Sequence, residues 1–165
     1  VLGGEYSVRG YDLRSIGPRD PTTDFVLGGN KSLLFNVEQS IGIAGPVHLI
    51  LFYDAGQVKD VGENFSWKEP LTQLTRVGGL SPADATSAAY LLSGFNNTLA
   101  TRIDNLGETS AFKTSTGAEI RFFMPVLNVP FRLIFAMNPQ RGGVLDNNLI
   151  PETRFKFRFA VGTTF

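Results

Sequence analysis

The chain has 165 residues, and its 15 lysine and arginine residues are balanced by 15 aspartate and glutamate residues. This neutral balance gives no general electrostatic attraction to nucleic acid or to an acidic partner. Cysteine is absent, which excludes a disulfide framework and thiolate chemistry, while 14 phenylalanines and 18 glycines favour β-structure with many turns. Every apolar run is too short for a transmembrane helix.

The first residues, VLGGEYSVRGY, contain no initiator methionine and no signal-peptide pattern. We therefore expect the chain to be a piece of a longer protein whose targeting segment lies upstream. Beyond this start, alternation of apolar and polar residues predicts strands over 32–43, 47–58, 113–124, 131–138 and 153–165.

The last predicted strand alternates most regularly. Its apolar positions are Phe155, Phe157, Phe159, Val161 and Phe165, and its other phase carries Arg154, Lys156 and Arg158. Such a strand has one apolar and one cationic face, which suits either a boundary between lipid and water or one layer of a soluble β-sandwich. Periodicity alone does not separate these two alternatives.

The predicted connections alternate in length, at about 3, 55, 4 and 15 residues along the chain. Short turns at one end and long loops at the other are typical of a transmembrane β-barrel, and strands of about ten residues cross the hydrocarbon when tilted. This favours the membrane alternative. The longest connection, 59–112, is polar and glycine-rich, and we expect one short helix within it, with Ser81 as N-cap and Gly94 as its stop.

About five strands cannot close a barrel, because the smallest membrane barrels have about eight. An open sheet would leave unpaired backbone groups in hydrocarbon. The fold class expected is therefore all-β, with the chain forming part of a larger transmembrane antiparallel barrel whose other strands lie upstream.

Three motifs resemble one family. SVRGYD near the start, FYDAGQV in the second strand and the paired strands of TGAEIRFFMPVLNVPFRLIFA look like the C-terminal barrel portion of BamA-type outer-membrane assembly factors, the bacterial surface antigen family. The resemblance covers most of the chain outside 59–112 and implies a barrel of about 16 strands. It implies that residues 1–31 are a loop folded into the barrel lumen, that 59–112 is an extracellular loop, and that 153–165 is the last strand.

The resemblance also implies a site. Arg9, at the tip of the lumen loop, would be held by Glu38 and Asp54 on the inner wall, while Gly10 allows a tight backbone and Tyr11 packs the tip. The alternation independently places Glu38 and Asp54 on the polar phase of neighbouring strands. The family usually has phenylalanine at the third motif position, so the hydroxyl of Tyr11 needs a partner.

The implied function is the assembly and insertion of β-barrel proteins into the bacterial outer membrane, without enzymatic activity, nucleotide or metal. Client strands would add at a seam formed by the last strand, with Phe155, Phe157, Phe159, Gly162 and Phe165 as seam residues, and Gly162 would weaken pairing there. The implied partners are outer-membrane lipids, client barrels and accessory assembly lipoproteins. A related export barrel, TamA-like or of two-partner secretion, remains an alternative, as does a soluble β-sandwich binding module.

Polar residues in this part of the sequence have two other interpretations, an acid/base pair and a zinc site. Glu38 and Asp54 could form a general acid/base pair, but a matching cation at Arg9 favours the structural role. His48 is the single histidine, and one histidine without cysteine does not make a zinc site of the usual kind.

Overall fold

The computed structural model describes residues 1–20, 23, 25–76 and 101–162. The helix expected from Ser81 to Gly94 and the terminal Phe165 lie outside these residues. The strands are Lys31–Ala44 (β1), Val47–Lys59 (β2), Lys68–Arg76 (β3), Thr101–Ser110 (β4), Lys113–Met124 (β5), Val129–Gln140 (β6) and Phe155–Val161 (β7).

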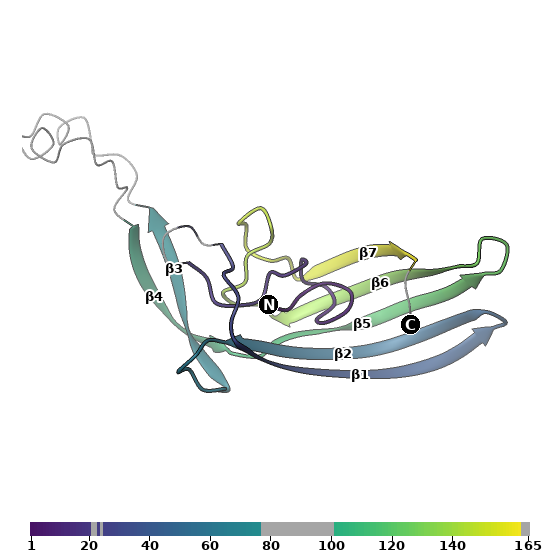
Figure 1. The fold of residues 1–165 in the computed structure, drawn as a ribbon, viewed down its shortest axis with the longest axis horizontal. Helices are drawn as coiled ribbons and strands as arrows, with labels where there is room; N and C mark the ends of the chain where they lie inside the picture. Colours follow the sequence, from purple (N-terminus) through teal and green to yellow (C-terminus); the bar gives the residue numbers. More distant parts are fainter. Residues whose placement is uncertain (21–22, 24, 77–100, 163–165) are drawn as a thin grey trace, which may run out of the picture.

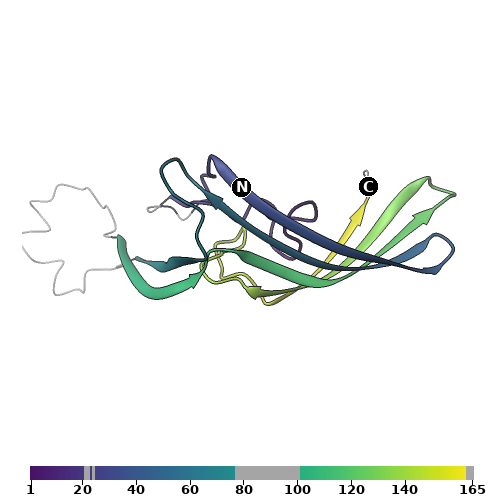
Figure 2. The ribbon, with the colours of Figure 1, turned by 90° about the horizontal axis from the view of Figure 1, so that it is seen from below.

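Five of these strands form one antiparallel sheet in the order β1-β2-β5-β6-β7, and β3 pairs with β4 in a separate two-stranded sheet. The main sheet curves along its strands, and the β3–β4 ribbon extends away from one end of it (Figures 1 and 2). The chain leaves the main sheet after β2, builds this ribbon, and returns as β5 directly beside β2. The sequence therefore predicted the five strands of the main sheet but neither strand of the ribbon.

The main sheet has two unlike faces because alternate residues of a strand point to opposite sides. The face that we call the apolar face carries side chains that remain exposed: Phe35, Val37, Leu51, Tyr53, Phe135, Phe155, Phe157, Phe159 and Val161. Rings pack along this face across neighbouring strands, with centroids of Phe135 and Phe157 5.0 Å apart and those of Phe122 and Phe131 5.1 Å apart. Within the described residues no second sheet covers the apolar face, so the packing of a β-sandwich is not seen there.

The opposite face, which we call the polar face, is covered in part by the described residues before β1, 1–20, 23 and 25–30. This N-terminal segment has no regular strand and lies against the sheet (purple in Figure 1). A small core fixes it there, made of Leu2, Val8, Tyr11, Ile16, Val58 and Val144. The segment also closes on itself through backbone bridges between Leu2 and Ile16 and between Arg19 and Val26.

The two outer strands of the main sheet differ in length. β1 has 14 residues and pairs with β2 along almost all of them, from Lys31↔Lys59 to Ala44↔Val47. β7 has seven residues, from Phe155 to Val161, and pairs with β6 from Met137↔Phe155 to Phe131↔Val161. In the part of the chain that the structure describes, no helix has the length and hydropathy needed to cross a membrane.

Candidate functional site: a buried arginine cluster under the N-terminal segment

Arg9 lies at the centre of the polar face, and only 2% of its surface is exposed. Its Nε donates to Oδ2 of Asp54 at 2.7 Å and its second terminal nitrogen donates to Oδ1 at 2.6 Å, so the pair is bidentate. The other terminal nitrogen donates to Glu38 at 2.6 Å and to Glu119 at 3.0 Å. The backbone amide of Arg9 also donates to Asp54, at 3.0 Å. Every guanidinium nitrogen therefore has a carboxylate partner.

Three neighbouring strands supply these carboxylates. Glu38 is on β1, Asp54 on β2 and Glu119 on β5, and the registers Glu38↔Phe52 and Ile50↔Glu119 place the three side chains around the ring of Phe52. The guanidinium carbon of Arg9 lies 4.0 Å from the centroid of that ring, which adds a cation–π contact. The sheet thus surrounds the guanidinium of Arg9 with three carboxylates and one aromatic ring.

Glu119 connects Arg9 to two further arginines. Arg121 donates to Glu119 at 2.9 Å and to Glu38 at 3.0 Å, and Arg132 of β6 donates to Glu119. We refer to Arg9, Glu38, Asp54, Glu119, Arg121 and Arg132 as the arginine cluster. Three cations balance three carboxylates, so the buried charges of the cluster compensate one another.

The structure brings together the three charged residues named from the sequence, Arg9, Glu38 and Asp54. It adds Glu119 of β5 as a direct partner of Arg9, which the sequence analysis did not assign to this site. The sequence does indicate that Glu119 points to the polar face, because it lies on the polar phase of its strand. What was missing was the neighbour relation of β2 and β5, which are separated by the 59–112 excursion.

Electrostatics favour the charged form of Arg9. Burial by itself lowers the pKa of Arg9, but the hydrogen bond and charge of Asp54 raise it, and Glu38 and Glu119 add to that effect. The net result is a pKa above the ordinary arginine value. Arg9 is therefore a permanent cation in this site.

Gly10 has no space for a side chain. Its φ is +86°, and a Cβ there would lie 2.4 Å from Oδ1 of Asn138 and 2.6 Å from Cβ of Ala136. The side-chain amide of Asn138 in turn donates to the carbonyl of Gly10 at 2.6 Å. The backbone of the segment thus approaches β6 as closely as a glycine permits.

Tyr11 is fully buried, and its hydroxyl is hydrogen-bonded to two backbone carbonyls. It lies 3.1 Å from the carbonyl oxygen of Thr114 and 3.0 Å from that of Gln140, at the ends of β5 and β6. Burial, together with the charge of Glu152, raises the pKa of Tyr11, so the hydroxyl stays protonated and acts as a donor.

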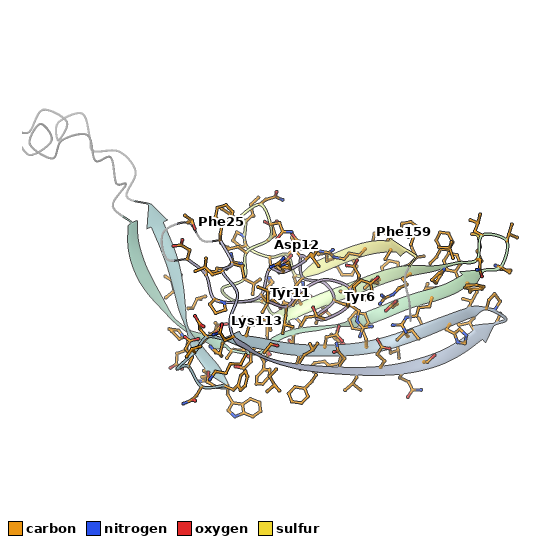
Figure 3. The ribbon with its side chains drawn as sticks, in the orientation of Figure 1. Tyr6, Tyr11, Asp12, Phe25, Lys113 and Phe159 are labelled. Carbon is orange, nitrogen blue, oxygen red and sulfur yellow. The ribbon has the colours of Figure 1, made fainter. Side chains whose placement is uncertain are left out.

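Asp12 contacts the last strand. Its Oδ1 accepts from Lys156 at 2.6 Å and from Arg158 at 2.7 Å (Asp12 is labelled in Figure 3). Burial raises the pKa of Asp12, but the hydrogen bond from Lys156, the amide of Asn147 and the two cationic charges outweigh this and leave the pKa below its ordinary value.

Of the expected seam residues, those that the structure describes lie on β7 and directly after it. Phe155, Phe157 and Phe159 belong to the apolar face, and 52% of the surface of Phe157 is exposed. Gly162 follows the strand with φ +76°, and its amide donates to the carbonyl of Pro130 at 3.0 Å, so the chain is still bonded to β6 there. Thus the apolar face and the seam residues share one side of β7, while its cations face the N-terminal segment.

The structure also places the single histidine and the carboxylates that the sequence analysis weighed for other roles. His48 is exposed near the β1–β2 turn, and the described residues include no group of three or more histidine, cysteine, aspartate or glutamate side chains arranged for a metal. The carboxylates of the cluster all face arginines, which suits a structural ionic network.

An antiparallel sheet with one exposed apolar face, and with an arginine-bearing segment buried on the other, fits part of the wall of a β-barrel membrane protein. The comparison with protein families agrees: the model of the Omp85 superfamily domain matches residues 1–165, and the chain belongs to that superfamily. It is a protein of the bacterial outer membrane.

The chain is also similar to the outer membrane protein assembly factor BamA of Nitratidesulfovibrio vulgaris strain Hildenborough. The two are 34% identical over 76 residues, which cover 42% of this chain and 9% of that relative. The chain therefore matches only a small part of this curated relative. No solved structure matches the chain.

Proposed function

We propose that this chain is the part of an outer-membrane assembly factor in which a lumen loop and a seam strand meet, and that the whole protein inserts β-barrel clients into the outer membrane. Membership of the Omp85 superfamily and the similarity to a BamA support this proposal. The observation that carries it is the arginine cluster, because it explains why a long irregular segment is held against a barrel wall. The role is non-enzymatic and uses no nucleotide or metal.

The two faces suit this role. The apolar face would contact acyl chains, whereas the polar face would border an aqueous lumen. The reverse orientation would place Arg154, Lys156 and Arg158 in hydrocarbon, at a cost of about 2–4 kcal/mol each near the midplane. In this orientation the N-terminal segment is a loop folded into the lumen, with Arg9 at its tip.

The seam would operate at β7. A strand at the edge of a sheet presents unpaired backbone groups, and a client strand can add to such an edge by β-augmentation. Burial of the client's apolar residues in lipid would then drive its insertion. The partners of the protein would be outer-membrane lipids, client β-barrel proteins and accessory assembly lipoproteins.

The test is substitution of Arg9 in the full-length protein. Arg9→Ala leaves the buried carboxylate of Asp54 without its cation, whereas Glu119 keeps Arg121 and Arg132. Breaking a buried pair in this way costs about 3–5 kcal/mol. We expect loss of protease resistance of the N-terminal segment and loss of client insertion into liposomes. Arg9→Lys keeps the charge but loses the bidentate geometry, so we expect an intermediate defect.

The matched control is Lys68→Ala, which removes the exposed pair of Lys68 with Glu108 at 3.5 Å and should change neither readout. A double-mutant cycle of Arg9→Ala with Asp54→Asn should show strong non-additivity in the unfolding free energy. Normal client insertion by a folded Arg9→Ala protein would contradict the proposed role of the cluster.

A further inference from the structure

The cations of β7 have no counter-charge on the neighbouring strand. In the register of the sheet, Lys156 lies opposite Ala136 and Arg158 lies opposite Ile134, both of which are apolar. Each cation instead reaches across to the N-terminal segment or to the loop before β7. The polar side of β7 is therefore held by side chains from outside the sheet.

Asp12 is the centre of these contacts. One of its oxygens receives both Lys156, at 2.6 Å, and Arg158, at 2.7 Å, and its carboxylate also accepts the amide of Asn147 at 3.0 Å. Arg158 additionally donates to the carbonyl of Tyr11 at 3.0 Å. We refer to Asp12, Lys156 and Arg158 as the Asp12 tether.

Two glutamates support the tether. Glu152 pairs with Lys156 at 2.6 Å and also accepts the backbone amide of Asp12 at 3.3 Å. Glu5 lies 3.8 Å from Arg158. The side chains of Asp12, Lys156 and Arg158 are between 19% and 24% exposed, so water screens these pairs less than it screens a surface pair.

The tether is coupled to the arginine cluster by a very short stretch of chain. Arg9 is bonded to β1, β2 and β5, whereas Asp12, three residues later, is bonded to β7. The two residues between them are fixed as well, Gly10 through Asn138 and Tyr11 through Thr114 and Gln140. Displacement of the segment at Arg9 therefore also withdraws Asp12 from β7.

We propose that Asp12 is a positioning residue that holds the last strand against β6, so that β7 separates from the sheet only when the N-terminal segment releases it. The inference rests on the proposed function, because it gives the lumen loop control over the seam. While the carboxylate of Asp12 holds Lys156 and Arg158, β7 stays paired with β6. Loss of that carboxylate removes the strongest link of β7 to the N-terminal segment, and leaves its backbone bonds, the ring contact of Phe157 with β6 and the pair of Lys156 with Glu152.

The experiment is hydrogen–deuterium exchange of the full-length protein in lipid nanodiscs, without any client. For Asp12→Asn we expect the amides of residues 155–161 to exchange about fivefold to 30-fold faster, and those of residues 47–59 to be unchanged. Asp12→Glu keeps the charge and should restore much of the protection. Glu108→Gln, which alters an exposed ion pair on β4, is the matched control and should leave β7 unchanged.

A cycle of Asp12→Asn with Arg158→Gln should be non-additive in the exchange rate of β7, because each change removes the same contact. Unchanged exchange of β7 in a folded Asp12→Asn protein would overturn the proposal. Client insertion is measured separately: faster exchange of β7 with normal insertion supports the tether and counts against a seam at β7, whereas unchanged exchange with lost insertion rejects the tether alone.

Discussion

At the scale of single residues, the site depends on three consecutive residues of the N-terminal segment, each of which has close contacts with the sheet. Gly10 combines a positive φ with no space for a Cβ, Arg9 makes a bidentate pair with Asp54, and the hydroxyl of Tyr11 reaches two carbonyls. The motif Arg9-Gly10-Tyr11 could be singled out from sequence by its resemblance to a family. The contacts of Asp12 could not, because the path of an irregular segment leaves no periodic signal.

Substitution of Gly10 and Gly62 distinguishes the cost of backbone strain at a positive φ from the cost of a steric clash of the added Cβ. Gly10→Ala and Gly62→Ala impose the same unfavourable backbone, since the φ angles are +86° and +87°, but only Gly10 has atoms that a Cβ would meet. We expect Gly62→Ala to cost about 1 kcal/mol and Gly10→Ala about 3 kcal/mol or more in the free energy of unfolding. Urea titrations of the two variants in detergent, followed by heat-modifiable gel mobility, measure this difference; equal costs would contradict the close approach to Asn138.

The Asp12 tether has a defined pH dependence. Because Lys156 and Arg158 hold the pKa of Asp12 below its ordinary value, its stabilisation is fully present above that value, about 3.9, and is lost as the pH falls through the lower folded-state pKa. The stability difference between wild type and Asp12→Asn should therefore be constant from about pH 8 to pH 5 and should shrink below about pH 4. Urea unfolding across this range checks the sign, and a difference that disappears already near pH 6 would be inconsistent with it.

At the scale of elements, alternation predicted those strands that separate two environments. β1, β2, β5, β6 and β7 have an apolar and a polar face, so their period of two is visible in sequence. β3 and β4 were missed because KEPLTQLTR and TRIDNLGETS carry polar residues on both phases and β3 contains a proline. A ribbon with polar residues on both sides gives no hydrophobic periodicity, although its backbone pairs regularly.

Trp67, at the start of this ribbon, lies at the end of the apolar face. It is 82% exposed, its ring is 5.4 Å from that of Phe112, and Phe112 is 6.3 Å from Phe35 of the apolar face. Tryptophan is favoured where lipid headgroups meet acyl chains. We therefore expect this aromatic cluster to lie at the membrane boundary.

Fluorescence quenching locates Trp67 in a full-length protein whose other tryptophans are replaced by phenylalanine. Lipids brominated near the carbonyl should quench Trp67 more strongly than lipids brominated near the chain end. As a control, Leu106→Trp in a Trp67→Phe background places the probe on β4, and should be quenched weakly by both. Stronger quenching of Trp67 from the chain end would place the boundary elsewhere.

At the scale of the whole molecule, the two faces of the main sheet have different surroundings. The apolar face is exposed across several strands, whereas the polar face holds a segment of the same chain through compensated charges. The alternation predicted which residues of a strand share a face, whereas the prediction of a membrane barrel also needed the loop lengths and the resemblance to a family. The arrangement of the arginine cluster depends on strand order, which the sequence could not supply.

Cysteine labelling tests the orientation, since the chain has no native cysteine. Val37→Cys on the apolar face should resist a membrane-impermeant maleimide in outer-membrane vesicles and react after denaturation, although Val37 is 64% exposed in the sheet. Asn148→Cys, in an exposed loop, should react in intact vesicles. Rapid labelling of Val37→Cys before denaturation would mean that water, and not lipid, covers this face.

The unequal outer strands set an order for disassembly. Within the described residues, β7 contributes seven residues to its ladder and β1 contributes 14, so far fewer backbone bonds must break to detach β7. Heat or mechanical pulling should therefore peel the sheet from the β7 side, while the long ladder of β1 with β2 is the last to unzip. Once the Asp12 tether is broken, the border at β7 is therefore the first to detach, whereas the border at β1 persists longest.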